Sequence, residues 1–328
     1  MVSASESISA PVAAHTSPRE RLRGLLLRSE TLRGYSLLSP TLLVMLMLLL
    51  IPMGAMVGMS FCTQRYVDID CTFSLNTYWT IFEPSDKAAY FLGIPFYLQK
   101  PIYLILLLKS ILISAASTIA VVVLAYPMAY FLAFRVTRHK MAWLIVITVP
   151  FWTSYLLRVF AWKVILGYQG VVNSGLMSLG IIDQPLGFLL YNPSSVILTL
   201  AHAWAAVAIL PLYVSLEKID RSLLEAATDL GDNHIQRFLR ITLPLSMPGV
   251  IAASLLVFIP TVGDYITPTL VGGTNGIMIG NVIQSLFGKG NNAPLAAAVS
   301  IIAMMVITIL VCLYLWAVGR NRPKRSRA

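Results

Sequence analysis

The residue types that most often do chemistry are few in this sequence and scattered along it. The GKG at Gly288–Gly290 lacks the upstream glycine and the Ser/Thr of a phosphate-binding loop. The three cysteines lack the spacing of a zinc site, and the histidines form no visible catalytic cluster. These histidines are His15, His139, His202 and His234. The pattern predicts no metal site, no bound cofactor and no enzyme activity in this chain.

Ionisable and aromatic residues inside apolar segments are the better candidates for a binding role, because charge at membrane depth is costly and usually pairs or faces a pathway. Asp264 is the first of these: its carboxylate could recognise a ligand ammonium group, with the ring of Tyr265 offering a cation–π contact. A pair with a basic neighbour, Arg158 above all, is the alternative. His202 and Trp204 could line the same cavity or could serve only in packing.

Two cysteines raise the question of a disulfide. Cys62 and Cys71 stand nine positions apart in a segment that the topology below places on the outer side, where a disulfide can persist. A bridge and two free thiols both remain open. Cys312 lies in an apolar run and is expected to be a small packing residue.

The composition indicates that lipid faces much of this chain. Of its 328 residues 57% are hydrophobic and only 12% charged, and its mean hydropathy is +0.78. A soluble protein this apolar would expose large aggregating patches. We therefore expect an all-α membrane protein with six transmembrane helices. The predicted spans are about 37–60, 109–134, 141–162, 195–216, 248–271 and 294–318.

Basic residues set the expected orientation. The predicted N-terminal tail (1–34, largely disordered), the loops after the second and fourth spans, and the basic C-terminal tail (321–328) hold most of the twenty-four Lys and Arg residues. The positive-inside rule assigns that side to the cytoplasm, so both termini should be cytoplasmic in a multi-pass protein of the inner membrane. The net charge of +10 is thereby explained without a nucleic-acid partner. Long outer loops are expected at 62–108, 163–194 and 272–293.

The most informative stretch is the predicted cytoplasmic loop 217–247. Leu223, Leu224 and Leu230 predict a short helix with an apolar side, and Gly231 a left-handed stop. A second short helix should follow and end at Pro244. An apolar face outside the bilayer indicates a protein partner.

Within this loop the sequence EAATDLGDNHIQRFLRITLP resembles the EAA-x3-G-x9-I-x-LP signature of the permease subunits of binding-protein-dependent ABC importers. Every fixed position is occupied, and these positions are Glu225, Ala226, Ala227, Gly231, Ile241, Leu243 and Pro244. The resemblance implies the type I ABC importer permease fold over residues 35–320.

In that family this loop is the coupling helix that seats in a groove of the ATPase. By resemblance, Ala226 and Ala227 permit close approach, Gly231 makes the turn, and Glu225 contacts or orders the interface. The implied partners are two ATPase subunits carrying ATP and Mg, a periplasmic substrate-binding protein, and a second homologous permease, with a heterodimer favoured.

Three further stretches, AYPMAYFLA, PFWTSYLLRVFAW and FIPTVGDYITPTLVGG, look like the spermidine/putrescine branch of these permeases. The resemblance implies transport of a small cationic or amine-containing solute. An opine, an amino-acid derivative or another small organic solute is the alternative substrate. An ion-gradient-driven secondary carrier is the alternative function; it would usually show paired inverted repeats, of which the sequence offers no convincing halves.

Overall fold

The computed structural model describes residues 30–66 and 68–320 of the chain. The chain divides into two compact units, residues 1–58 and 59–328, each described here by itself. In the first unit, helix α2 (Glu30–Ser60, whose last two residues belong to the second unit) is long and apolar enough from Leu37 onward to cross a membrane. It begins within the predicted tail 1–34. Residues 1–29 of that tail, and the predicted tail 321–328, lie outside the described residues.

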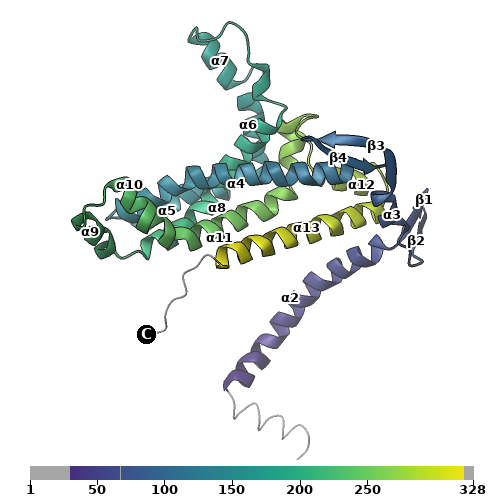
Figure 1. Ribbon diagram of the computed structural model, residues 1–328, viewed down its shortest axis with the longest axis horizontal. Helices are drawn as coiled ribbons and strands as arrows, with labels where there is room; N and C mark the ends of the chain where they lie inside the picture. The colour runs from purple at the N-terminus through teal and green to yellow at the C-terminus, as the bar shows by residue number, and fades with distance from the viewer. Residues whose placement is uncertain (1–29, 67, 321–328) are drawn as a thin grey trace, which may run out of the picture. The chain divides into compact units, whose positions relative to one another are not determined.

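The second unit is built mainly of helices, with two small antiparallel hairpins near its start (Figure 1). In chain order its elements are β1 (Thr63–Arg65), β2 (Asp68–Asp70), α3 (Asn76–Phe82), β3 (Pro84–Phe91), β4 (Ile94–Leu98), α4 (Ile102–Phe134), α5 (Lys140–Thr148), η1 (Val149–Trp152), α6 (Tyr155–Leu166), α7 (Val171–Ser178), η2 (Gly187–Leu189), α8 (Pro193–Glu217), α9 (Arg221–Asp229), α10 (His234–Arg237), η3 (Phe238–Thr242), α11 (Leu243–Val262), η4 (Pro268–Gly272), α12 (Ile279–Phe287) and α13 (Ala293–Arg320).

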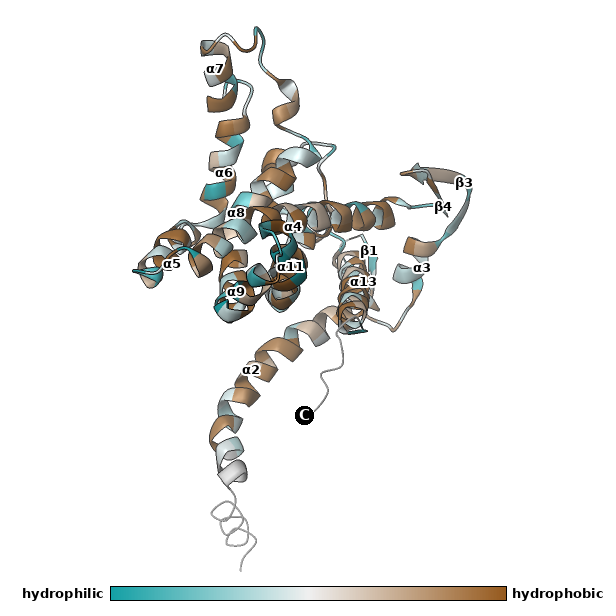
Figure 2. Ribbon diagram, turned by 60° about the vertical axis from the view of Figure 1, so that its left-hand side comes forward, coloured by the Kyte–Doolittle hydropathy of each residue, from teal (hydrophilic) through white to brown (hydrophobic). Residues whose placement is uncertain are grey.

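Five helical segments of the described chain are long and apolar enough to cross a membrane: the apolar part of α2, then α4, α8, the run His234–Val262 and α13. A bent pair, Lys140–Trp152 with Tyr155–Ser178, makes a sixth if it counts as one broken span. The hydropathy colouring shows the long helices as apolar along most of their length (Figure 2). Helices of this kind satisfy their backbone polar groups internally, as lipid requires.

Two of the predicted spans are broken, for local reasons. The segment predicted as one helix over 141–162 bends by 80° between η1 and α6. Pro150 lies in η1, and the two residues that follow the end of η1, Thr153 and Ser154, are extended. The segment predicted over 248–271 ends as an α-helix at Val262; Gly263, Asp264 and Tyr265 are non-helical, and the chain is helical again from Ile266 into the π-helix η4. The span predicted from 109 begins earlier, at Ile102.

The core of the second unit lies where α4, α8 and α11 pack together. Buried alanines, among them Ala125, Ala129 and Ala208, let these helices approach closely. Gly249 of α11 packs so tightly on α8 that a Cβ there would lie 2.5 Å from the Cβ of Ser215. Buried hydroxyls such as those of Ser117 and Thr118 donate to the carbonyl four residues earlier, so they need no partner in lipid.

Hairpins that the sequence did not indicate occupy the predicted outer loop 62–108. A disulfide joins Cys62 to Cys71 around the β1–β2 hairpin, which answers the question left open by the sequence. The hydroxyl of Thr77 donates to the carbonyl oxygen of Cys62 over 2.8 Å, so the bridge is tied to α3. Cys312 is exposed on α13 and is not the packed residue that was expected.

Candidate functional site

The signature loop forms a helical hairpin, α9 and α10, at one end of α4, α8 and α11, and the β3–β4 hairpin lies at the other end (Figure 1). Asp220 caps α9 by accepting a hydrogen bond from the backbone nitrogen of Ser222 over 3.0 Å. Hydrogen bonds from Ser222 lower the pKa of Asp220 below its ordinary value. The cap therefore keeps its charge at neutral pH and is lost only as the pH falls through that lowered pKa.

Gly231 makes the turn between the two helices in the left-handed region, with φ of +89°. The backbone nitrogen of Asp232 donates to the carbonyl of Ala227 and that of Gly231 to the carbonyl of Thr228. These bonds satisfy carbonyls at the end of α9, as a Schellman-type stop does. The turn that the signature implies at Gly231 is thus explained by its positive φ and by these two backbone hydrogen bonds.

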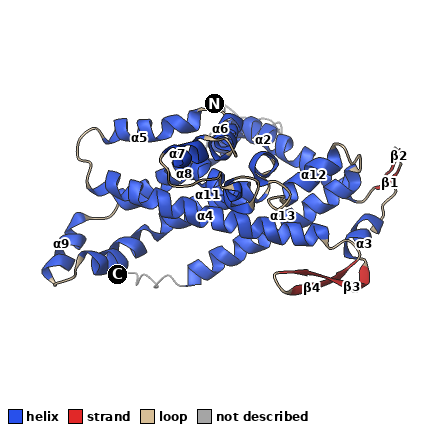
Figure 3. Cartoon of the chain, turned by 90° about the horizontal axis from the view of Figure 1, so that it is seen from above, coloured by secondary structure: helices blue, strands red, loops and turns tan. Residues whose placement is uncertain are grey.

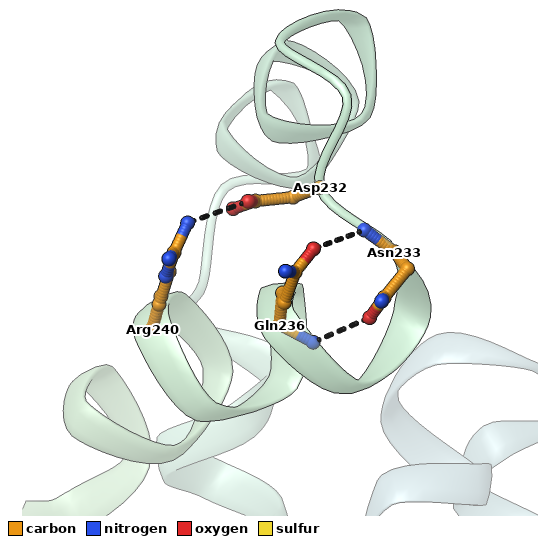
Figure 4. Close-up of polar contacts among 4 residues, drawn as sticks. All are labelled: Asp232, Asn233, Gln236 and Arg240. Atoms are coloured by element: carbon orange, nitrogen blue, oxygen red, sulfur yellow. Dashed lines mark hydrogen bonds and ion pairs between the residues drawn. The ribbon is translucent and has the colours of Figure 1, made fainter.

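Polar side chains fix α10 against the turn (Figure 4). Asn233 and Gln236 form a reciprocal capping box at the start of α10, with hydrogen bonds of 2.9 and 3.0 Å. Arg240 forms an ion pair with Asp232 at 2.8 Å, and Arg237 donates to the hydroxyl of Thr228 over 2.9 Å. The hairpin is therefore held by contacts of its own chain.

The sequence predicted that the second helix of the hairpin ends at Pro244, and this prediction is wrong. The chain stays helical from His234 through η3 into α11, ending at Val262. Pro244 lies inside this continuous helix, two residues after the π-helix η3 ends at Thr242. The loop is consequently continuous with a membrane span.

The structure divides the signature residues between an inner and an outer face. Ala227 is buried against its own chain, whereas Glu225 and Ala226 are exposed. Ile241 and Leu243 are half-buried in the helix that leads to α11, and Pro244 is exposed. Of the two alanines expected to permit close approach, only Ala226 is available to a partner.

Large apolar side chains remain uncovered on this hairpin. The exposed fractions are 88% for Leu230, 71% for Ile235 and 55% for Leu239, and that of Leu223 is 47%. Because this end of the helices carries the charged residues of the loop as well, lipid does not account for the exposure. The four leucine and isoleucine side chains are named the apolar hairpin patch below.

Contacts at the base of the hairpin join it to the helical core. The ring of Phe238 packs edge-on against Tyr126 of α4, with centroids 5.7 Å apart. The hydroxyl of Tyr126 lies 2.7 Å from that of Ser246 in α11. Lys140 and Glu217 form an ion pair at 2.6 Å between the start of α5 and the end of α8. These contacts connect the hairpin with α4 and α11.

A polar cluster lies beyond the other end of α11. The hydroxyl of Tyr155 donates to Asp264 over 2.5 Å and lies 2.6 Å from the hydroxyl of Thr267. The second carboxylate oxygen of Asp264 accepts from the backbone nitrogen of Ile266. The sequence pointed to Asp264 but not to Tyr155 or Thr267. Asp264 is half-exposed, and its neighbour Tyr265 is 45% exposed.

Arg158 does not take the role of ion-pair partner suggested for it. Its guanidinium donates to the carbonyl oxygen of Ala203 over 2.7 Å and lies 5.4 Å from the ring centroid of Phe151 and 5.8 Å from that of Tyr155. A backbone carbonyl and aromatic faces thus hold this charge. Tyr155, and not Arg158, is the hydrogen-bond partner of Asp264.

Trp204 and His202 diverge, although they are two residues apart on α8. The ring of Trp204 lies near Tyr155, with centroids 6.3 Å apart, whereas the ring of His202 packs against Trp162 at 5.4 Å. Trp204 therefore shares a neighbourhood with Asp264 through Tyr155. His202 is exposed on its helix and belongs to a different contact.

Comparison with known families decides the class of the protein. The family model for the "Binding-protein-dependent transport system inner membrane component" matches residues 36–322. The chain belongs to this family. As a member, it is a transporter permease subunit and a multi-pass membrane protein.

Similar proteins include several permeases from bacteria. This permease is 39% identical over 228 residues to the spermidine/putrescine transport system permease protein PotB of Escherichia coli (strain K12), covering 70% of this chain and 82% of PotB. It is 36% identical over 227 residues to the inner membrane ABC transporter permease protein YdcU of the same organism, covering 66% and 71% of the two chains.

Solved structures agree on the fold. A bacterial ABC transporter that imports the acidic polysaccharide alginate contains a chain that superimposes with a TM-score of 0.66 at 20% identity, covering 93% of this permease and 100% of that chain. The same kind of transporter in complex with an alginate-bound periplasmic protein gives a TM-score of 0.64. This permease therefore has the predicted type I importer fold, which does not itself set the substrate.

Proposed function

We propose that this chain forms one half of the transmembrane pathway of an ATP-driven importer, and that the α9–α10 hairpin couples it to a separate ATPase subunit. The observation that carries the proposal is the apolar hairpin patch. Leu230 and Ile235 are 88% and 71% exposed at the end of the molecule where the loop's charges lie. Burial of two such side chains by a partner contributes roughly 1.5–3 kcal/mol each.

A nearly continuous helix connects the hairpin to the polar cluster. α10 and η3 run into α11, and Asp264 follows two residues after α11 ends at Val262. The twenty residues of α11 extend about 30 Å. Closure of the ATPase would push one end of this rod and displace the other, so that ATP binding shifts the population between inward- and outward-open states.

The proposed solute is a polyamine such as putrescine or spermidine. PotB, named as a spermidine/putrescine permease, covers most of this chain at 39% identity. The half-exposed carboxylate of Asp264 offers a site for an ammonium group, and the exposed ring of Tyr265 an adjacent cation–π face. Trp204 and Arg158 would border the pathway. We propose that His202 lines the pathway farther from Asp264.

The proposed assembly follows the family. Two ATPase subunits carrying ATP and Mg would bind the hairpins of this permease and of a homologous, non-identical second permease. A periplasmic binding protein would deliver the solute to the opposite end. Both termini would then be cytoplasmic, since Arg135, Arg138, Lys218 and Arg221 lie at the same end as the hairpin.

Uptake by the reconstituted complex tests this function. Proteoliposomes are prepared with this permease, the homologous second permease, the ATPase and the binding protein. They should import radiolabelled putrescine or spermidine only when ATP is enclosed in their lumen. Asp264→Asn should raise the KM for the diamine several-fold. Uptake driven by a proton or sodium gradient without ATP would overturn the importer assignment. ATP-driven uptake of a neutral or anionic solute alone would overturn only the substrate.

Changes in the apolar hairpin patch test the coupling step separately. Leu230→Ser with Ile235→Ser should abolish co-purification of the ATPase and uptake, because the change removes the apolar area available for burial. Leu245→Ser, which changes a 46% exposed leucine of α11, is the matched control and should retain the ATPase. Equal ATPase recovery from both variants would contradict a coupling role for the patch.

A further inference from the structure

The β3–β4 hairpin, at the end opposite the coupling loop, is unusually apolar for a water-exposed ribbon. No charged residue occurs from Ala88 to Gln99. Asp86, Lys87 and Lys100 flank that stretch at the base of the hairpin. Charge is therefore confined to the end that joins the rest of the molecule.

The strand register places apolar side chains on both faces of the ribbon. Phe91 pairs with Ile94 on one face, and Tyr90 pairs with Pro95 on the other. The exposed fractions are 71% for Tyr90 and 51% for Ile94. A ribbon in water normally keeps one face polar. Neither face of this one does so near its turn.

The turn itself carries a residue that its backbone disfavours. Leu92 and Gly93 have φ of +52° and +80°, as in the two-residue hairpin turns that favour Asn, Asp or Gly at both positions. A leucine in the left-handed region costs about 1–2 kcal/mol. Its side chain is nevertheless 72% exposed, so contacts within the described chain do not repay that cost.

The position of the hairpin beside a membrane span indicates what covers it. Only Gln99, Lys100 and Pro101 separate β4 from Ile102, the first residue of α4. Figures 1 and 3 show the hairpin standing off from the helices with its turn directed back along α4. The turn is thus directed along a candidate membrane span (Figure 1).

We propose that the tip of the β3–β4 hairpin, formed by Tyr90, Leu92 and Ile94, inserts into the interfacial layer of the leaflet in which α4 begins. Tyrosine rings suit this layer, where one end of the ring is apolar and the other wet. The unpaired strand edges need water, so the tip stops at the headgroup and upper acyl level. Lys87 and Lys100 at the base face lipid phosphates.

Spin labelling measures this insertion directly. The full-length permease, assembled with its partner subunits, is placed in nanodiscs of phosphatidylcholine with a minor share of phosphatidylglycerol. Cys312 is first changed to serine, and a nitroxide is then attached at Ile94→Cys or, as the control at the base, Asp86→Cys. The ratio of collisions with oxygen, which concentrates in lipid, to collisions with a water-soluble nickel chelate should be several-fold higher at position 94 than at 86.

Leu92→Asn separates lipid contact from hairpin folding, because asparagine suits the turn better than leucine does. In that background the oxygen-to-nickel ratio at position 94 should fall towards the value at 86, while the mobility of the label at 86 stays unchanged. Equal ratios at 94 and 86 in the parent protein would overturn the proposal. So would a label at 94 shielded from both reagents, which would show that protein covers the hairpin.

Discussion

At the residue scale, Tyr155 decides how Asp264 is held within the membrane unit. The phenol has one proton, which it donates to Asp264, so it accepts from the hydroxyl of Thr267. The carboxylate also receives the backbone N–H of Ile266. Asp264 is therefore held by hydrogen bonds and forms no ion pair with a described residue, so a substrate ammonium group would not have to break an ion pair to bind it.

Tyr155→Phe should destabilise the permease and alter its affinity for a cationic solute. The variant removes one hydrogen bond to a carboxylate and leaves the hydroxyl of Thr267 without its acceptor, a loss of about 1–3 kcal/mol. Thermal unfolding of the purified complex and the KM of uptake measure the two effects. Tyr168→Phe, on a 63% exposed ring, is the control. Equal melting temperatures and equal KM values for the two variants would contradict the role of Tyr155.

The sequence could predict Asp264 and could not predict its partner. A carboxylate between apolar segments is conspicuous because of its cost. Tyr155 is one of fourteen tyrosines, and nothing in its local sequence distinguishes it. Arg158 was the evident candidate by charge, but its guanidinium donates to the carbonyl of Ala203. The alternative that Asp264 pairs with Arg158 is therefore wrong, since Tyr155 and the backbone nitrogen of Ile266 bind the carboxylate.

At the element scale, the α9–α10 hairpin could be predicted closely, because its signals are local. Gly231 marks the turn by residue type alone, as predicted from the sequence, whereas the caps Asp220 and Asn233 were identified only in the structure. The end of the second helix was not predictable in the same way. Pro244 indicates a helix end by residue type, whereas in the structure the helix continues through it, with Phe238 and Ser246 on either side contacting Tyr126 of α4.

Gly231→Ala should weaken the hairpin through its backbone. A Cβ at Gly231 meets nothing within 4 Å, so the cost comes from φ of +89° and amounts to about 1–2 kcal/mol. We expect a lower melting temperature for the complex and a fall in ATP-driven uptake. Gly175→Ala, which adds the same methyl group in open space inside α7, should be neutral or slightly stabilising. Unchanged uptake and stability in Gly231→Ala would show that the turn tolerates another geometry.

Hydropathy alone indicates neither the breaks in the helices nor the outer hairpins. Val149–Trp152 and Gly263–Asp264 read as parts of apolar runs, and hydropathy reports apolar character but not direction. The hairpin β3–β4 is short and apolar on both faces, so it lacks the alternation that marks a strand in sequence.

At the scale of the whole molecule, the α9–α10 hairpin and the polar cluster lie at opposite ends of α11 in the second unit. The hairpin carries exposed leucine and isoleucine side chains, and the polar cluster carries Asp264. Gly249 packs α11 tightly against α8, and Tyr126 joins it to α4, so the three helices should move together. In the proposed function, this arrangement would let an ATPase subunit that moves the hairpin also move the polar cluster.

The central claim is that the α9–α10 hairpin seats in a separate ATPase, and photo-cross-linking in whole cells tests it most directly. A photoreactive phenylalanine analogue replaces Leu230, the most exposed leucine of the apolar hairpin patch, and in a control strain it replaces Leu245 of α11. The account predicts that irradiation joins position 230, and not position 245, to a nucleotide-binding protein. Cross-links from position 230 only within its own chain or to lipid would contradict it.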